Sequence, residues 1–339
     1  MKLGLQLGYW GAQPDDDIAI SKTAETLGYD FVQIAEAYGS DCFTRLSWIG
    51  AHTERIKLMT MTQLSARTPT CAAGSAMTLD HLSGGRVIIS VGVSGPQVVE
   101  GWYGQPFPKP LQRTREWLDI YRQVTRRKEP LEFVGEQYQV PLTKEKGAMG
   151  LGKPLKSILH PLRDDIPVYL AAEGPKNVAL ATRSFDGWLP IWVSPYRFMD
   201  LYSDQCAALS DNFEIPMSLA VNINDDLDAA LLGVKWMLAL YIGGMGARNK
   251  NFYNDFAKKM GYEEAAVKIQ DLYLDGKKQE AAAAVPDSLV DEISLVGPKE
   301  RIAERFEAWK EASERNHVGT MLLGLQQPEA LELMAELAF

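Results

Sequence analysis

The stretch Arg86-Val-Ile-Ile-Ser-Val91 decides the fold, because its β-branched and apolar residues run on without the alternation of a half-exposed strand. Such a run is typical of a parallel strand that is covered on both faces. Gly-rich turns lie on either side of it, at Gly84-Gly85 and at Gly92-Val-Ser-Gly95. The sequence therefore predicts a buried parallel strand of an α/β sheet.

Similar strands recur on both sides of this stretch, and amphipathic segments separate them. The spacing on the N-terminal side is about 27 residues, which matches repeated βαβ units. The eight expected strands are 3–8, 31–35, 56–60, 86–91, 167–171, 187–190, 217–223 and 318–323. The main helices between them are expected at 44–52, 70–82, 113–127, 175–184 and 195–211, with another beginning near Pro298.

Two segments interrupt this rhythm. Residues 130–165 are rich in Gly, Pro and Lys and are expected to form a lid or binding segment. Residues 225–285 are expected to form a largely helical inserted segment. We therefore predict an α/β fold, a (β/α)8 TIM barrel that forms one domain over residues 1–339, with insertions after strands 4 and 7. The alternative is a doubly wound open sheet, but the first turn, Gly8-Tyr-Trp-Gly11, is not its GxGxxG signature.

Composition excludes several classes of protein. The 339 residues carry a net charge of -9, which argues against nucleic acid or an anionic membrane as the main partner. No apolar run approaches the roughly 18 residues that span a bilayer, and the start of the chain lacks a signal core. Three separated cysteines and four scattered histidines form no disulfide framework and no HExxH motif. A cytoplasmic enzyme without a metal site is expected.

The active site of a parallel barrel lies at the carboxyl ends of its strands. After strand 5, Glu173-Gly-Pro-Lys-Asn177 opens a helix whose N-terminus, with Lys176 and Asn177, can donate to a phosphate. A plain proline-led turn explains this motif equally well. After strand 2, Glu36 can bind a cofactor edge or move a proton, unless a neighbouring Arg or backbone amide simply satisfies it.

Aromatic side chains at the same ends suit a flat ligand. Trp10, Trp102, Tyr103 and Trp192 are candidates for an aromatic wall, although each alone can equally be core or rim. His160 is the only histidine that the insertion can carry to this end. Asp80 and His81 lie before strand 4, where a structural role is expected.

Five motifs together resemble the luciferase-like oxidoreductases, and most closely the branch that uses the deazaflavin coenzyme F420 and is typical of actinobacteria. The resemblance extends from Leu3 to about Leu323. The motifs are Tyr29-Asp-Phe-Val-Gln-Ile-Ala-Glu-Ala-Tyr-Gly-Ser-Asp41, Leu79-Asp-His-Leu-Ser-Gly-Gly-Arg86, Val93-Ser-Gly-Pro-Gln-Val-Val-Glu-Gly-Trp102, Ala171-Ala-Glu-Gly-Pro-Lys-Asn-Val178 and Asp186-Gly-Trp-Leu-Pro190.

The resemblance implies a (β/α)8 barrel and a set of cofactor-binding positions. A non-proline cis peptide at Thr60-Met61 would support the deazaflavin ring, whose edge would lie near Glu36 and Thr62. The phosphate-bearing tail would bind at the loops after strands 4 and 5. The residues expected there are Ser94, Gly95, Gly174, Pro175 and Asn177.

Two departures from the F420 dehydrogenases limit the assignment. Their Asp-His pair is replaced by Glu36-Ala37, and their Glu acid by Pro96-Gln97. The expected function is therefore an F420-dependent oxidoreductase in which Glu36 is the catalytic candidate. An FMN-dependent monooxygenase and a non-catalytic cofactor-binding barrel stay open as alternatives.

A small-molecule substrate is expected to contact Trp10, Tyr38, Trp102, His160 and Trp192. The apolar segment Ala229–Leu240 allows a homodimer.

Overall fold

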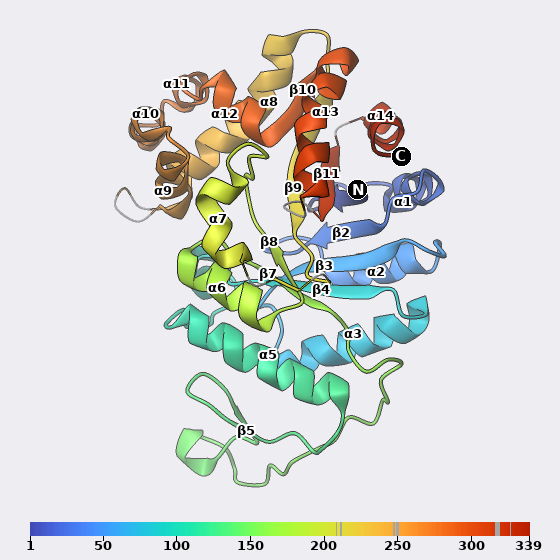
Figure 1. The fold of residues 1–339 in the computed structure, drawn as a ribbon. Coiled ribbons are helices and arrows are strands. Elements are labelled where there is room, and N and C mark those ends of the chain that lie inside the picture. Colours follow the sequence, from blue (N-terminus) through green and yellow to red (C-terminus); the bar gives the residue numbers. More distant parts are fainter. Residues whose placement is uncertain (208, 211, 247, 249–250, 316–318, 326) are drawn as a thin grey trace. The chain divides into compact units, whose positions relative to one another are not determined.

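The structure is a computed structural model that describes residues 1–339 apart from 208, 211, 247, 249–250, 316–318 and 326 (Figure 1). The described chain divides into two compact units. The N-terminal unit comprises Gly4–Leu189 and Ser210–Phe213, and the C-terminal unit comprises Pro190–Leu209, Glu214–Phe339 and Met1–Leu3. That residues 1–339 form a single domain stays a prediction.

The N-terminal unit contains a parallel sheet in which neighbouring strands follow one another along the chain. Its order is β1-β2-β3-β4-β7-β8. Representative register pairs are Gly4 with Phe31, and Ile89 with Val168. Each pair of neighbours is joined through at least one helix, as βαβ units require. The bounds are β1 Lys2–Leu7, β2 Phe31–Ala35, β3 Lys57–Gln63, β4 Val87–Gly92, β7 Val168–Ala171 and β8 Gly187–Leu189.

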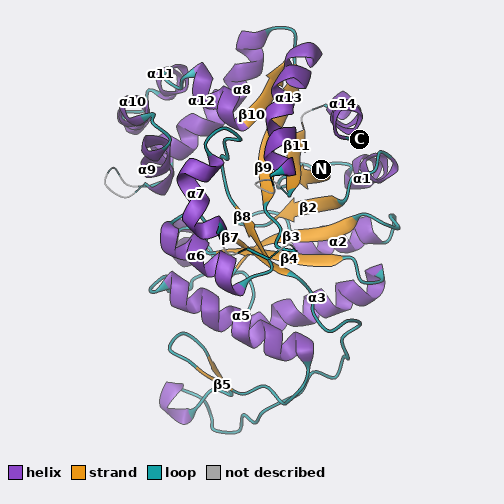
Figure 2. Ribbon diagram, viewed as in Figure 1, coloured by secondary structure: helices purple, strands orange, loops and turns teal. Residues whose placement is uncertain are grey.

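Side-chain caps at the helix starts explain where several helices of this unit begin. Asp16, Asp41 and Thr68 each accept a backbone N–H of the first turn. Helix α3 ends at Gly84, whose left-handed φ of 68° suits glycine. The helices, coloured purple in Figure 2, are α1 Asp17–Thr26, α2 Cys42–Gly50, α3 Pro69–Ser83, α4 Pro96–Gly101, α5 Pro110–Arg126 and α6 Pro175–Ser184.

Strand β4 is buried along its whole length, as its sequence predicts. Helix α5 packs against α3 and contributes the fully buried Trp117 and Tyr121, whose rings stack 5.2 Å apart. Burial of rings this large is the main favourable term of the core.

The segment 130–165 follows α5 and is mostly irregular, as expected. It contains the short antiparallel hairpin of β5 Phe133–Val134 and β6 Gln139–Val140, and a 3₁₀ turn at Lys144–Lys146. Whether it is an insertion relative to a standard barrel stays a prediction, and so does the insertion at 225–285.

The C-terminal unit contains three parallel strands in the order β10-β9-β11, namely β9 Pro216–Ile223, β10 Ser294–Gly297 and β11 Thr320–Leu325. The expected total of eight strands is wrong, because β10 raises the number in the parallel sheets of the described chain to nine. Val318 of the expected last strand lies outside the described residues. The helices of this unit are α7 Phe198–Cys206, α8 Leu227–Ala239, η2 Leu240–Gly244, α9 Phe252–Lys259, α10 Glu263–Leu274, α11 Lys278–Ala283, α12 Asp287–Ile293, α13 Lys299–Glu314 and α14 Pro328–Ala338.

Helix α8 continues into the π-helical η2 as one apolar stretch, Leu227–Gly244. Its 18 residues have a mean hydropathy of 1.3, so by length and composition alone it can cross a membrane. The expectation that no apolar run approaches this length is therefore wrong. In the C-terminal unit the helix packs against β10 and α11, and its Leu238 and Ala239 are fully buried, which is the behaviour of a core helix.

Candidate active site

The carboxyl ends of β2 and β3 bring a buried carboxylate and its donors together. Glu36 follows β2 and is 8% exposed. One oxygen, Oε2, accepts from the Thr62 hydroxyl at 2.7 Å and from the Cys42 thiol at 3.1 Å, while Oε1 accepts from the Arg67 guanidinium at 3.1 Å. The carboxylate is thus arranged as an acceptor for its own neighbours. This geometry matches the alternative in which nearby groups satisfy the acid.

Arg67 links this carboxylate to a second one. Its guanidinium also pairs with Asp41, and it lies 4.8 Å from the centre of the Phe43 ring. The Nε of Arg67 is buried without a hydrogen-bond partner among the described residues. An orphaned donor of this kind is costly unless water or a ligand satisfies it.

Two protonated groups border the Glu36 carboxylate. Burial raises the pKa of the Cys42 thiol well above its ordinary value, and the neighbouring Glu36 charge raises it further. Tyr103 donates its hydroxyl to the Ala37 carbonyl, and burial, followed by the Glu36 charge, raises the pKa of Tyr103 to about 12. Both groups therefore stay protonated at neutral pH and act as donors.

The peptide between Thr60 and Met61 is not cis, so that expectation is wrong. The one cis bond among the described residues is Val140–Pro141. Thr60 is fully buried, and its hydroxyl bonds the Ser90 carbonyl at 3.2 Å and accepts the Ser90 N–H at 3.1 Å. Thr60 therefore serves the join between β3 and β4. Met61 is half-buried and lies beside Gly92. A Cβ added to Gly92 would lie 3.1 Å from the Met61 Cε.

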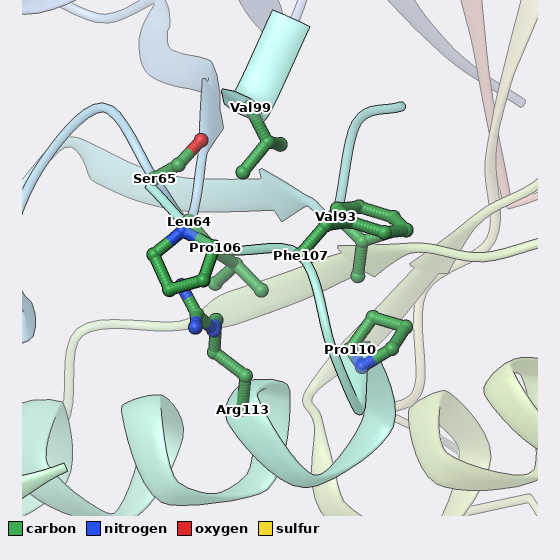
Figure 3. A pocket seen from close by; sticks show the side chains of 8 residues that line it. All are labelled: Leu64, Ser65, Val93, Val99, Pro106, Phe107, Pro110 and Arg113. Carbon is green, nitrogen blue, oxygen red and sulfur yellow. The ribbon is translucent and has the colours of Figure 1, made fainter. Parts of the chain in front are cut away.

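The loop after β4 contributes a strained residue and a small pocket. Ser94 has a φ of 59°, which is uncommon for a residue with a side chain, and Gly95 caps α4. Figure 3 shows side chains from the ends of β3 and β4, from α4 and from the start of α5 around this pocket. Its free volume of about 10 Å³ is at the lower limit of the space that a single water needs. The Ser65 hydroxyl and the Arg113 Nε are buried there without partners among the described residues. The lining residues are Leu64, Ser65, Val93, Val99, Pro106, Phe107, Pro110 and Arg113.

A second pocket shares Val93 and Pro110 with the first and opens at the N-terminus of α6. Its volume is about 430 Å³, and its walls are Val93, Pro110, Leu111, Gly174, Pro175, Lys176 and Asn177. The positive end of the α6 dipole and the Lys176 ammonium favour an anion there. The Asn177 Oδ1 is buried without a partner among the described residues.

Gly174 leaves this pocket open. A Cβ built on Gly174 meets no atom within 4 Å. Its carbonyl accepts the N–H groups of Asn177 at 2.8 Å and Val178 at 2.9 Å, which leaves the N–H of Lys176 as the donor of the first turn. A free N–H at a helix N-terminus can bind an anion, and the phosphate site that the sequence predicts at this motif stays a prediction.

Three of the expected substrate contacts lie near Glu36 in the N-terminal unit. Tyr38 and Trp102 are 67% and 64% exposed, and their ring centres lie 6.5 Å apart. They form an exposed aromatic pair. Trp10 is different: its indole N–H donates to Asp17 at 3.4 Å, and the Arg45 guanidinium lies over its ring.

The structure does not bring His160 to these residues. The His160 carbonyl bonds a ring nitrogen of His81, which lies in the last turn of α3 and therefore at the amino end of β4. The expectation that His160 reaches the carboxyl ends is wrong for this reason. Trp192 belongs to the C-terminal unit, where it is buried at a φ of 50° and packs against Tyr241 and Tyr253.

The sequence pointed to Glu36 but did not identify its partners. Arg67 lies seven residues beyond Thr60, and only the pairing of β2 with β3 places it beside Glu36. Nothing in the sequence marked Arg113 as a candidate site residue, because its position is that of an ordinary charged residue of α5. Among the described residues, no three His, Cys, Asp or Glu side chains form a group that could hold a metal ion.

Comparison with known proteins identifies the family. The profile of the luciferase-like monooxygenase family matches residues 3–315. A Mycobacterium tuberculosis protein named as a coenzyme F420-dependent oxidoreductase is 52% identical over 323 residues, 92% of each chain. The 5,10-methylenetetrahydromethanopterin reductase of Archaeoglobus fulgidus is 25% identical over 328 residues, 93% of this chain and 92% of its own.

A solved structure shows the fold class. The coenzyme F420-dependent tetrahydromethanopterin reductase of Methanopyrus kandleri superposes with a TM-score of 0.77 at 21% identity, over 99% of this chain and 97% of its own. The fold class is therefore α/β of the (β/α)8 barrel type, as the sequence predicts. From the profile match and the 52% identity it follows that the chain belongs to the luciferase-like monooxygenase family.

Proposed function

We propose that this protein is an oxidoreductase that uses coenzyme F420 to transfer hydride to or from a small organic molecule. The observation that carries the proposal is the 52% identity, over 92% of both chains, to a protein named as an F420-dependent oxidoreductase. The deazaflavin supplies the hydride chemistry, and the protein supplies binding, orientation and electrostatics.

The anionic tail of the cofactor would be held in the pocket at the start of α6. An acidic protein with a net charge of -9 cannot attract an anion through its overall field, so it needs local donors. Lys176 offers an ammonium and a backbone N–H, and the absent side chain of Gly174 allows a close approach. The Asn177 amide can accept from a cofactor hydroxyl or, if flipped, donate to a phosphate.

The deazaflavin ring would lie toward the carboxyl ends of β2 and β3. Ser94 and Gly95 follow the pocket residue Val93 on the loop after β4, where they would contact the cofactor. At the ring end, Met61 offers a half-buried thioether. Glu36 and Thr62 offer a pre-formed hydrogen-bonding pair whose atoms are 2.7 Å apart.

Glu36 would act in this scheme as a fixed acceptor. Its three donors use most of the carboxylate. The Tyr103 hydroxyl, which donates to the neighbouring Ala37 carbonyl, stays protonated at neutral pH because its pKa is raised to about 12. A substrate would meet the exposed pair Tyr38 and Trp102, which present flat apolar faces to a small organic molecule.

Cellular location and assembly are part of the same proposal. The three cysteines Cys42, Cys71 and Cys206 are free thiols, which suits the reducing cytoplasm. A homodimer would use the exposed Leu232, Trp236 and Leu240 of the α8 stretch, which are 47%, 39% and 41% exposed.

Cofactor titration tests the proposal. Purified protein is titrated with F420 while the fluorescence of the deazaflavin is followed, and separately with FMN. We expect quenching with micromolar affinity for F420 and weaker binding of FMN. A protein that binds FMN tightly and F420 not at all would instead be a flavin monooxygenase, which turns over with a flavin reductase and oxygen. Tight F420 binding with no turnover in a broad substrate screen would point to a non-catalytic cofactor-binding protein.

A further inference from the structure

A run of large apolar side chains between β6 and β7 is exposed to solvent. Met149, Leu151, Leu155 and Ile158 are 85%, 81%, 67% and 95% exposed. They occur within ten residues of chain in the N-terminal unit, and Leu142 and Leu159 extend the run on either side. Large apolar side chains that are this exposed and this close together in the chain indicate a site of interaction.

Lysines alternate with these apolar residues. Lys144, Lys146, Lys153 and Lys156 are all exposed, and Glu145 is the only acid between Leu142 and Leu159. This face, residues 142–159, therefore carries three excess positive charges in a chain whose net charge is -9. The local surface is thus opposite in sign to the protein as a whole.

The backbone of this face and the Lys156 side chain are tied to the end of α5, while the apolar side chains and the other lysines are exposed. Leu155 accepts the Leu131 N–H at 2.9 Å, and the Ser157 carbonyl accepts from the Arg127 guanidinium at 2.7 Å. Lys156 donates to the Lys128 carbonyl at 2.6 Å. These anchors tie the face to the end of α5, and Figure 1 shows the segment on the side of α5 away from β1–β4.

The composition of the face discriminates between partners. In a two-fold dimer each lysine cluster would lie against its own copy, which costs free energy. Protein interfaces are enriched in aromatic residues, Met and Arg and depleted in Lys. Residues 142–159 contain one Met and four Lys but no aromatic residue and no Arg. Aliphatic side chains interleaved with lysines are what an anionic lipid surface accepts.

We propose that residues 142–159 dock the protein onto a lipid bilayer that carries anionic head groups. Lys144, Lys146 and Lys153 contact the head groups, and Met149, Leu151, Leu155 and Ile158 enter the boundary with the acyl chains. The overall charge, which argues against an anionic membrane, does not decide the matter, because fields from distant acids are screened beyond roughly 8 Å at physiological salt. This docking is independent of the identity of the cofactor.

Cosedimentation with vesicles tests this inference on the full-length protein. Vesicles of phosphatidylcholine alone are compared with vesicles that contain phosphatidylglycerol as well. We expect binding to the anionic vesicles only, weakened in 0.5 M NaCl relative to 0.1 M. The triple variant Lys144→Gln, Lys146→Gln, Lys153→Gln should lose roughly tenfold or more in partition coefficient. The variant Leu151→Ser, Ile158→Ser should lose binding at unchanged charge.

The matched control carries the same charge change elsewhere, as Lys22→Gln, Lys277→Gln, Lys299→Gln, and should bind like the unmodified protein. All five substituted positions of the face are exposed, so circular dichroism and F420 titration should be unchanged in its variants. Equal binding by the face variants and the control would overturn the proposal, as would absence of binding to anionic vesicles in 0.1 M NaCl. A dimer in sedimentation that Leu151→Ser, Ile158→Ser converts to monomer would show instead that a second copy occupies the face.

Discussion

Arg45 shows how single residues hold the N-terminal unit together around the candidate site. Its guanidinium makes two bonds of 2.8 Å to the Asp17 carboxylate, and both side chains are 4% exposed or less. It also donates to the Gly8 carbonyl at 2.6 Å and lies over the Trp10 ring. Arg45 therefore joins the end of β1, the start of α1 and helix α2.

Removing Asp17 should be costly, because it leaves the Arg45 charge buried and unpaired. We expect Asp17→Ala to lower the free energy of unfolding by about 3–5 kcal/mol. Denaturant titration measures this. Asp15→Ala changes an exposed acid two residues away and should stay within about 0.5 kcal/mol. A loss below 1 kcal/mol for Asp17→Ala would show that the pair is not buried as described.

At this scale the sequence predicted candidates better than their surroundings. Glu36 could be chosen because the site of a parallel barrel lies at the carboxyl ends of its strands, yet its bonds to Cys42 and Arg67 depend on tertiary pairing. Thr60 was assigned to the cofactor, whereas its hydroxyl serves β4. The position of a residue along a strand can be predicted from the sequence. The hydrogen-bond partner of its hydroxyl cannot, because tertiary packing decides which groups are adjacent.

At the scale of elements, one carboxylate organises the hairpin of β5 and β6. Glu116 on α5 is buried and accepts the backbone N–H groups of Glu136, Gln137 and Tyr138 at 2.9, 2.8 and 2.8 Å. Burial alone would raise the pKa of Glu116, but the bonds from Gln112 and these three N–H groups outweigh it and lower the pKa.

The hairpin should therefore depend on the charge of Glu116. A lowered carboxyl pKa contributes stability that is present above the ordinary value of about 4.3 and lost as pH falls below it. We expect Glu116→Gln to destabilise the hairpin locally by about 1–3 kcal/mol. Hydrogen exchange at Glu136, Gln137 and Tyr138 should accelerate near neutral pH. Asp119→Asn, an exposed change on the same helix, should leave it unaltered, and identical exchange in both variants would refute the role of Glu116.

Helices with strong end signals were the most predictable elements. The bounds of α6 are 175–184, as predicted from the proline in its first turn and the spacing of its apolar residues. Strand β10 was missed because Ser294–Gly297 is only four residues long and directly follows a helix. Short apolar runs of this kind do not separate strand from helix by periodicity.

For the whole molecule, buried tyrosines contribute to the response of stability to alkaline pH. Burial raises the pKa of Tyr138 to about 12 and raises the pKa of Tyr29 and Tyr121 further. An unfolded tyrosine ionises near pH 10, so between these values the unfolded state binds fewer protons. The stability contribution is complete below pH 10 and falls as pH rises above it.

The free energy of unfolding should thus fall between pH 10 and 11, with a slope that approaches about 1.4 kcal/mol per pH unit for each such tyrosine. Urea titrations at pH 8, 10 and 11 measure it. Tyr121→Phe isolates one group, because the Tyr121 hydroxyl is buried without a partner among the described residues. This variant should be near neutral at pH 8 and show a smaller alkaline slope. An unchanged slope would contradict the assignment.

At this scale the alternation of strands and helices predicted the barrel class, while the position of His160 could not be foreseen. The segment that carries it returns to the amino end of β4, where Arg163 makes bonds of 2.9 and 2.7 Å to Asp80. A long irregular segment has no periodicity from which its course can be read.

The start of α6 is proposed to hold the anionic tail of F420, and substitutions of Gly174 probe this binding. Asp and Asn are equally good helix caps at this position and have nearly the same size, but only Asp adds negative charge. We expect Gly174→Asn and Gly174→Asp to unfold at similar temperatures, while Gly174→Asp binds F420 roughly tenfold or more weakly than Gly174→Asn. Equal F420 affinity of the two variants by fluorescence titration would show that the start of α6 does not bind the anionic tail.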